Sequence, residues 1–96
     1  MAVKVPSVVL EAAERLMLRA SHDLNRTLEG QVGRAWKAHT HAEVREALQA
    51  VLDRHGADLS LGWRLQIVVD DRLVGNTAHA RPVFVGPEGE VVEWEP

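Results

Sequence analysis

The sequence predicts an α+β fold, with two helices followed by an antiparallel sheet. Two segments within the first 56 residues repeat apolar residues at helical spacing, whereas the last third alternates apolar and polar residues as strands do. Clusters of turn-forming residues separate the alternating segments. The 96 residues fit one domain, and no internal repeat divides them. We therefore expect residues 1–96 to form a single α+β domain.

The first predicted element is a long amphipathic helix over residues 7–29. Ser7 is the expected N-cap, and Gly30 stands where a C-terminal glycine cap is expected. On a helical wheel the residues of the apolar face share an arc about 120° wide. They are Val9, Leu10, Ala13, Leu16, Met17, Ala20, Leu24, Thr27 and Leu28. The residue types of segment 21–23 favour caps, which leaves open whether this is one helix or two.

The second helix is predicted over about residues 41–55. Thr40 and Glu43 have the spacing of a capping box, in which each side chain satisfies the other's backbone N–H. Gly56 follows the last residue of this segment and is a C-terminal signal. The apolar arc comprises Val44, Ala47, Leu48, Val51 and Leu52. The segment before it, residues 30–39, fits either a short strand or an irregular connection.

The chain from Trp63 onward predicts an antiparallel meander of about four strands. Asp70-Asp71 is expected to form a two-residue hairpin turn, and Gly-Pro-Glu-Gly at 86–89 the turn of a second hairpin. Pro82 should lie at a strand start or at a sheet edge, because proline has no N–H to donate to a neighbouring strand.

Composition excludes several chemistries. There are no cysteines, which excludes disulfides and thiol catalysis, and a reducing cytoplasm is the expected location. No segment approaches the ~20 apolar residues of a membrane span. The net charge is −3, yet residues 1–40 carry six basic and four acidic side chains, whereas residues 41–96 carry five basic and ten acidic ones. A net acidic chain is a poor general binder of nucleic acid, but this asymmetry leaves room for a local basic surface.

The most chemistry-like cluster is His39-Thr40-His41. On a strand, residues two apart face the same way, so the two histidines could share a metal ion. The capping box instead places them at a helix start, where residues two apart diverge. His55 would then lie about 21 Å further along the helix axis, too far to bind the same ion. We therefore expect a helix start, with no metal and no cofactor.

No other pattern indicates catalysis. Asp70-Asp71 is expected to be a solvated turn, and neither a nucleophile elbow nor a phosphate-binding loop is present. These observations favour a protein that is not an enzyme.

A basic stripe lies opposite the apolar arc of the first helix. Arg15, Arg19, His22 and Arg26 fall within about 60° of one another on the wheel. Either this stripe is a solvated outer face, with Glu11 and Arg15 as an i,i+4 pair, or it contacts an acidic partner or a phosphate backbone.

The last hairpin carries apolar residues on both faces. Phe84, Val92 and Trp94 would share one face, and Val83, Val85 and Val91 the opposite one. A sheet with one face in water should alternate apolar and polar residues, so either the two helices cover both faces or one face docks on another chain. We expect the second, because two helices joined by a short connection do not readily reach opposite sides of a sheet. The predicted partner-binding residues are Val83, Phe84, Val85, Val91 and Trp94.

The leading hypothesis is a non-enzymatic protein-interaction or regulatory module that forms a homodimer through its sheet. A nucleic-acid-associated regulator that uses Arg15, Arg19 and Arg26 is the first alternative. A small metal-dependent enzyme that uses the histidines is the second.

Overall fold

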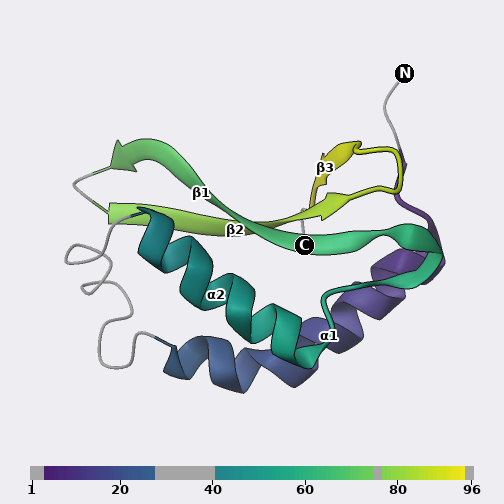
Figure 1. The fold of residues 1–96 in the computed structure, drawn as a ribbon, viewed down its shortest axis with the longest axis horizontal. Coiled ribbons are helices and arrows are strands. Elements are labelled where there is room, and N and C mark those ends of the chain that lie inside the picture. Colours follow the sequence, from purple (N-terminus) through teal and green to yellow (C-terminus); the bar gives the residue numbers. More distant parts are fainter. Residues whose placement is uncertain (1–3, 28–40, 75–76, 95–96) are drawn as a thin grey trace.

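The fold is α+β, as predicted, with two helices on one side of a three-stranded antiparallel sheet (Figure 1). The structure is a computed structural model, and it describes residues 4–27, 41–74 and 77–94. The elements are α1 (Ser7–Arg26), α2 (His41–His55), the 3₁₀ turn η2 (Ser60–Gly62), β1 (Arg64–Val74), β2 (Thr77–Val85) and β3 (Val91–Glu93). The strands lie in the order β1-β2-β3.

The core lies between the two helices and the sheet. α1 buries Val9, Ala13, Leu16 and Ala20, and α2 buries Val44, Leu48, Val51 and Leu52. Both sets follow the helical spacing seen in the sequence. The sheet adds Leu65, Ile67 and Phe84, and Trp63 joins them from the residue before β1. Full burial of each large apolar side chain contributes about 1.5–3 kcal/mol, so these residues hold the two layers together.

The start of α1 differs from the prediction by one residue. Pro6 is the N-cap, and Ser7 is already helical and makes no capping bond with its side chain. The Pro6 carbonyl accepts the N–H groups of Val9 and Leu10 at 3.0 and 3.1 Å. Proline suits this place because its ring fixes φ and the missing N–H is not needed at a helix start.

The end of α1 comes earlier than predicted. Thr27 leaves the helix with ψ 129°, and both its N–H and its hydroxyl donate to the Asp23 carbonyl, at 2.8 and 2.7 Å. Segment 21–23 does not divide the helix: the Ser21 hydroxyl donates to the Leu18 carbonyl at 3.0 Å, and the chain stays helical. Gly30, the predicted cap, lies outside the described residues.

The predicted bounds of α2 are confirmed. Gly56 follows it with φ +96°, the left-handed conformation that ends many helices. Thr40 and the segment 30–39 lie outside the described residues, so the capping box and the short strand stay predictions.

The prediction of a hairpin turn at Asp70-Asp71 is wrong, and so is the fourth strand that it implied. β1 continues through both residues to Val74, which pairs with Thr77. The pairing register shifts between Asp70 and Val74, as at a β-bulge. Two-residue hairpins favour Asn-Gly or Asp-Gly, because they need positive φ, and Asp-Asp does not supply this readily. The described sheet accordingly has three strands.

Pro82 lies neither at a strand start nor on an outer strand, but within the central strand β2. It is opposite Ile67, whose N–H points away from β2. The side of Pro82 that lacks a donor therefore faces β3, and β3 ends at Glu93, opposite Val83. Proline is tolerated here because β2 has no described strand on its β3 side from Thr77 to Pro82, so this part of β2 is a sheet edge.

The turn predicted at residues 86–89 is confirmed. The Gly89 N–H donates to the Gly86 carbonyl at 3.0 Å, and the Gly86 N–H donates to the Glu90 carbonyl at 2.8 Å. Gly89 has φ +86°, which explains a glycine at this place.

Candidate functional site

The two faces of the sheet have different surroundings. Leu65, Ile67 and Phe84 point to the helices and are buried in the core. The opposite face, which we call the outer sheet face, carries the apolar residues Val68, Val83, Val85 and Val91. Both described helices lie on the other side of the sheet (Figure 1). Neither described helix therefore covers the apolar residues of this face.

Exposure varies across the outer sheet face. Val83 is only 2 % exposed, and it lies in the central strand with Gln66 and Glu93 as its cross-strand neighbours. Val85 is half-buried, and Val91 at the sheet edge is 64 % exposed. Val91 is thus the apolar side chain of this face that is most available for contact.

The five predicted partner-binding residues divide between the two faces, as the alternation indicates. Phe84 is 1 % exposed and packs between two tryptophan rings, with centroids 6.5 Å from Trp63 and 5.5 Å from Trp94. Trp94 is half-buried and, with Met17, lines an apolar hollow of about 310 Å³ between α1 and the sheet. Phe84 is therefore a core residue of this chain, and the accessible candidates are Val85, Val91 and part of Trp94.

The arginines on the sheet side are held by carboxylates. Arg81 contacts Glu93 through Nε and Nη2, at 2.9 and 2.8 Å, and so links β2 to β3 beside Val83. Arg64 donates to Asp58 at 2.8 Å and also to Asp53. The hydrogen bond to Asp58, followed by the charges of Asp53 and Asp58, raises the pKa of the Arg64 guanidinium above its usual value. These two arginines therefore hold elements of the fold together.

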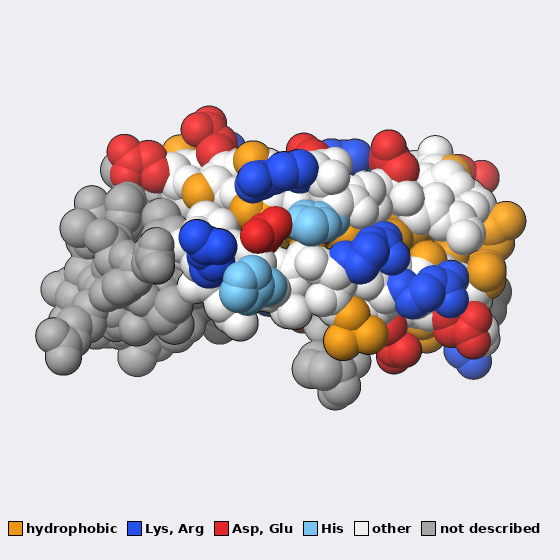
Figure 2. Space-filling view, turned by 90° about the horizontal axis from the view of Figure 1, so that it is seen from below, with side chains coloured by type: hydrophobic (Ala, Val, Ile, Leu, Met, Phe, Trp, Pro, Cys, Tyr) orange, Lys and Arg blue, Asp and Glu red, His pale blue; other side chains and the backbone are white. Residues whose placement is uncertain are grey.

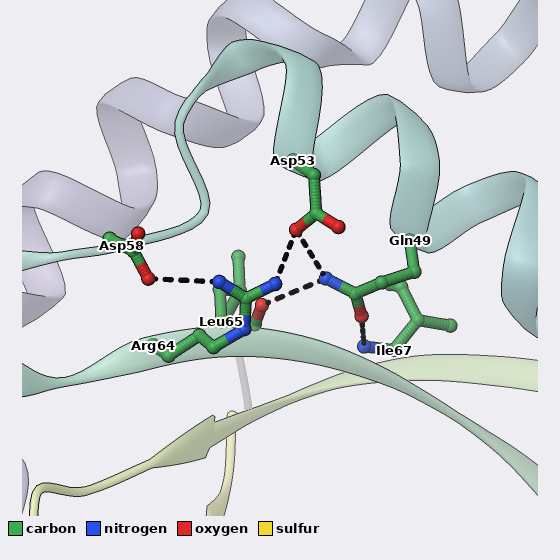
Figure 3. A network of polar contacts seen from close by, with 6 residues as sticks. All are labelled: Gln49, Asp53, Asp58, Arg64, Leu65 and Ile67. Carbon is green, nitrogen blue, oxygen red and sulfur yellow. Dashed lines mark hydrogen bonds and ion pairs between the residues drawn. The ribbon is translucent and has the colours of Figure 1, made fainter.

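The edge of β1 that does not pair with β2 is covered by a network of polar side chains, which the sequence did not reveal (Figure 3). Gln49 on α2 accepts a hydrogen bond from the Ile67 N–H at 2.7 Å and donates to the Leu65 carbonyl at 3.4 Å. Its amide also donates to Asp53 at 3.1 Å, and Asp53 binds Arg64. A groove of about 500 Å³ runs beside this network between α2 and β1. The spacing Gln49–Asp53 was visible in the sequence, but the pairing with a distant strand was not.

The helices form a basic surface on the side away from the sheet. Arg15, Arg19 and Arg26 are exposed along α1, as the wheel predicts, and α2 adds the exposed Arg54 and the half-buried His55. Figure 2 views this side and shows basic side chains gathered around two histidines and one acidic group. We call Arg15, Arg19, His22, Arg26, Arg54 and His55 the two-helix basic face. Sequence reasoning found only its α1 half, because packing of α2 against α1 brings in the rest.

The acidic group in this face is Asp23. Its carboxylate lies 2.6 Å from Nε2 of His55, and this pair joins the two helices. The hydrogen bond from His55 is the main cause that lowers the pKa of Asp23, and the charges of His55, Arg54 and His22 act in the same direction. The Arg19 guanidinium reaches the His55 carbonyl at 3.5 Å. The negative charge of Asp23 is therefore balanced by its neighbours, and the arginines of this face outnumber it.

Of the predicted cluster His39-Thr40-His41, only His41 lies among the described residues. His41 is the first residue of α2 and lines a hollow of about 310 Å³ beside β1, whereas His39 lies outside the described residues. In the described part of the chain, no group of three or more histidine and carboxylate side chains is arranged to hold a metal ion. The side chains of Asp70 and Asp71 lie outside what the structure describes. Among the helices described, none is long and apolar enough to cross a membrane.

Comparison with protein-family models gave no match, and neither curated proteins nor solved structures matched the chain.

Proposed function

We propose that the protein is a non-enzymatic interaction module that pairs with a second copy of itself through the outer sheet face. The observation that carries the proposal is Val91, an apolar side chain 64 % exposed beside Val85 and Val68 on a face that neither helix covers. Removal of apolar area from water contributes roughly 25 cal/mol per Å², so such a face gains by contact with another apolar surface. The cysteine-free chain suits a cytoplasmic location.

A second copy suits this surface better than an unrelated partner. Most soluble oligomers are symmetric, and a two-fold axis brings the same patch of both chains together. The outer sheet face has charges of both signs at its border, from Arg64, Arg81 and Glu93, so an antiparallel copy would place unlike charges opposite one another. β3 is only three residues long and forms the sheet edge, which favours packing of faces over long pairing of edges.

The test is the mass in solution at micromolar concentration. Sedimentation equilibrium should report about twice the 10.6 kDa chain mass. Val91→Glu should shift the protein to monomer, because it buries a charge in the contact. Leu18→Glu is the matched control: Leu18 is 77 % exposed on α1, on the helix side, and its replacement should leave the mass unchanged. A monomeric wild type, or an equal effect of both variants, would overturn the proposal.

A further inference from the structure

We infer that the two-helix basic face binds the phosphate backbone of a double-stranded nucleic acid. This goes beyond self-association, and it does not depend on it. The face lies on the helix side of the molecule, and the outer sheet face lies on the opposite side, so both surfaces stay accessible in a dimer (Figures 1 and 2).

The first support is the difference between two groups of arginines. On the sheet side, Arg64 and Arg81 are held by carboxylates within 3 Å. On the helix side, Arg15, Arg19, Arg26 and Arg54 make no ion pair with any residue that the structure describes. Glu11 and Arg15, which the sequence suggested as a pair, form none there. The helix-side arginines thus hold their charge available for an outside anion.

The second support is that Asp23, the acidic side chain within the face, is bound by a neighbouring histidine. A carboxylate among arginines would repel phosphate, but Asp23 is bound by His55 at 2.6 Å and surrounded by further cations. Arg19 is directed to the end of α2 by its contact with the His55 carbonyl. The helices are therefore joined at a point where the net charge is positive.

The geometry fits an extended anion. Arg15 and Arg26 are eleven residues apart on one helix, which is about 16 Å along its axis. Arg54 adds a fourth cation from the neighbouring helix. Phosphates recur along a duplex at regular short intervals, and arginine binds them in a bidentate manner. Glu11 stands one turn before Arg15, so the Arg19, Arg26 and Arg54 end of the face should contribute most.

The composition of the face separates nucleic-acid duplexes from other anions. The face has no phenylalanine, tyrosine or tryptophan. Its rings are the imidazoles of His22 and His55, and His55 is bound to Asp23, whereas single strands are bound largely by base stacking on accessible aromatic rings. Membrane-surface helices insert a continuous apolar side, whereas the apolar residues of α1 that face the core, including Val9 and Leu16, are fully buried. The exposed large apolar residues of this helix are Val8, Leu10 and Leu18. Protein contacts are usually anchored by aromatic residues, and phosphate contacts need only charge and hydrogen-bond donors.

The experiment measures the affinity for a short labelled DNA duplex by fluorescence anisotropy across a salt series. If all four arginines contact phosphates, log K against log salt should have a slope of about −3.6, and affinity should fall about 150-fold between 50 and 200 mM NaCl. A single-stranded oligonucleotide and vesicles that contain phosphatidylserine are measured in parallel. Both should bind more weakly than the duplex.

The matched variants are Arg54→Gln and Arg45→Gln. Both arginines are exposed on α2, and they are nine residues apart, about two and a half turns, so they lie on opposite sides of the helix. Arg54→Gln should reduce the magnitude of the slope by about 0.9, and Arg45→Gln should not change it. The double variant Arg26→Gln/Arg54→Gln breaks no hydrogen bond or ion pair seen in the described chain, and it should reduce the magnitude by about 1.8.

Three results would overturn the inference. One is no duplex binding at 50 mM NaCl by a folded wild type. Another is an equal effect of Arg45→Gln and Arg54→Gln on the slope, which would show that binding does not depend on this face. The third is a preference for anionic vesicles or for single strands over the duplex. A monomeric wild type that binds the duplex would contradict only the proposed self-association.

Discussion

The Gln49 side chain binds the backbone of Ile67 on the side of β1 that faces away from β2. Its carbonyl oxygen accepts the Ile67 N–H at 2.7 Å, while its amide donates to the Leu65 carbonyl two residues earlier. Further towards the start of β1, the Leu65 N–H donates to the Ala57 carbonyl at 2.9 Å. A helix side chain and a short stretch of backbone thus cover an edge that would otherwise offer unpaired groups to another chain.

Replacement of Gln49 by methionine should lower the free energy of unfolding by about 1–3 kcal/mol. The cost arises because the Ile67 N–H, in a residue only 4 % exposed, loses its acceptor while the side-chain volume is kept. Gln66→Met is the control, because Gln66 lies on β1 beside Ile67, is exposed and has no side-chain hydrogen bond among the described residues. Urea unfolding measures both. Equal stability of Gln49→Met and the wild type would show that water replaces the amide without cost.

The Asp23–His55 pair predicts a stability change in acid. Because His55 lowers the folded-state pKa of Asp23, the pair stabilises the fold above the ordinary aspartate pKa of about 3.9. The contribution is lost as pH falls through the still lower folded-state pKa. A double-mutant cycle with Asp23→Asn and His55→Gln should therefore give a favourable coupling at pH 6 that disappears at low pH. A coupling that persists in acid would contradict this assignment.

Local patterns in the sequence predicted the helices well because their physics is local. The buried residues of both helices fall within the predicted apolar arcs, although Leu10 of the first arc is exposed, and Gly56 and Gly89 have the positive φ values that glycine permits. The Asp70-Asp71 turn failed because a chain of polar residues fits a turn and a long twisted strand equally well. Only pairing of Val74 with Thr77 decides between them, and that pairing is not visible from either segment alone.

The candidate surfaces were predictable only in part. The α1 half of the two-helix basic face and the apolar residues of the outer sheet face follow from periods of 3.6 and 2. Arg54 and His55 join α1 through packing between helices, and Gln49 reaches β1 across 18 residues of chain. Sequence spacing does not report such contacts. For the same reason, alternation separated Phe84 from Val83 but did not say which face the helices cover.

Gly56→Ala should lower stability by about 1 kcal/mol. Gly56 has φ +96°, where a side chain strains the backbone, while a β-carbon there would meet no atom within 4 Å. The cost is therefore conformational and not steric. Gly56→Asn should cost less than Gly56→Ala, because asparagine tolerates the left-handed region better. Thermal or urea unfolding of the three proteins gives the ranking, and an asparagine variant weaker than the alanine variant would count against a helix end of this kind.

Phe84→Ala should destabilise each chain by about 3–5 kcal/mol, independently of protein concentration. Phe84 is 1 % exposed and fills the space between Trp63 and Trp94, so its truncation leaves a cavity within the chain. Val91→Ala should cost each chain far less, because Val91 is 64 % exposed, and should act instead through concentration-dependent association. Denaturant curves at two protein concentrations separate these effects, with Phe84→Leu as the milder variant where alanine prevents folding. If the midpoint of a Phe84 variant, rather than that of Val91→Ala, moved with concentration, Phe84 would belong to the contact between chains.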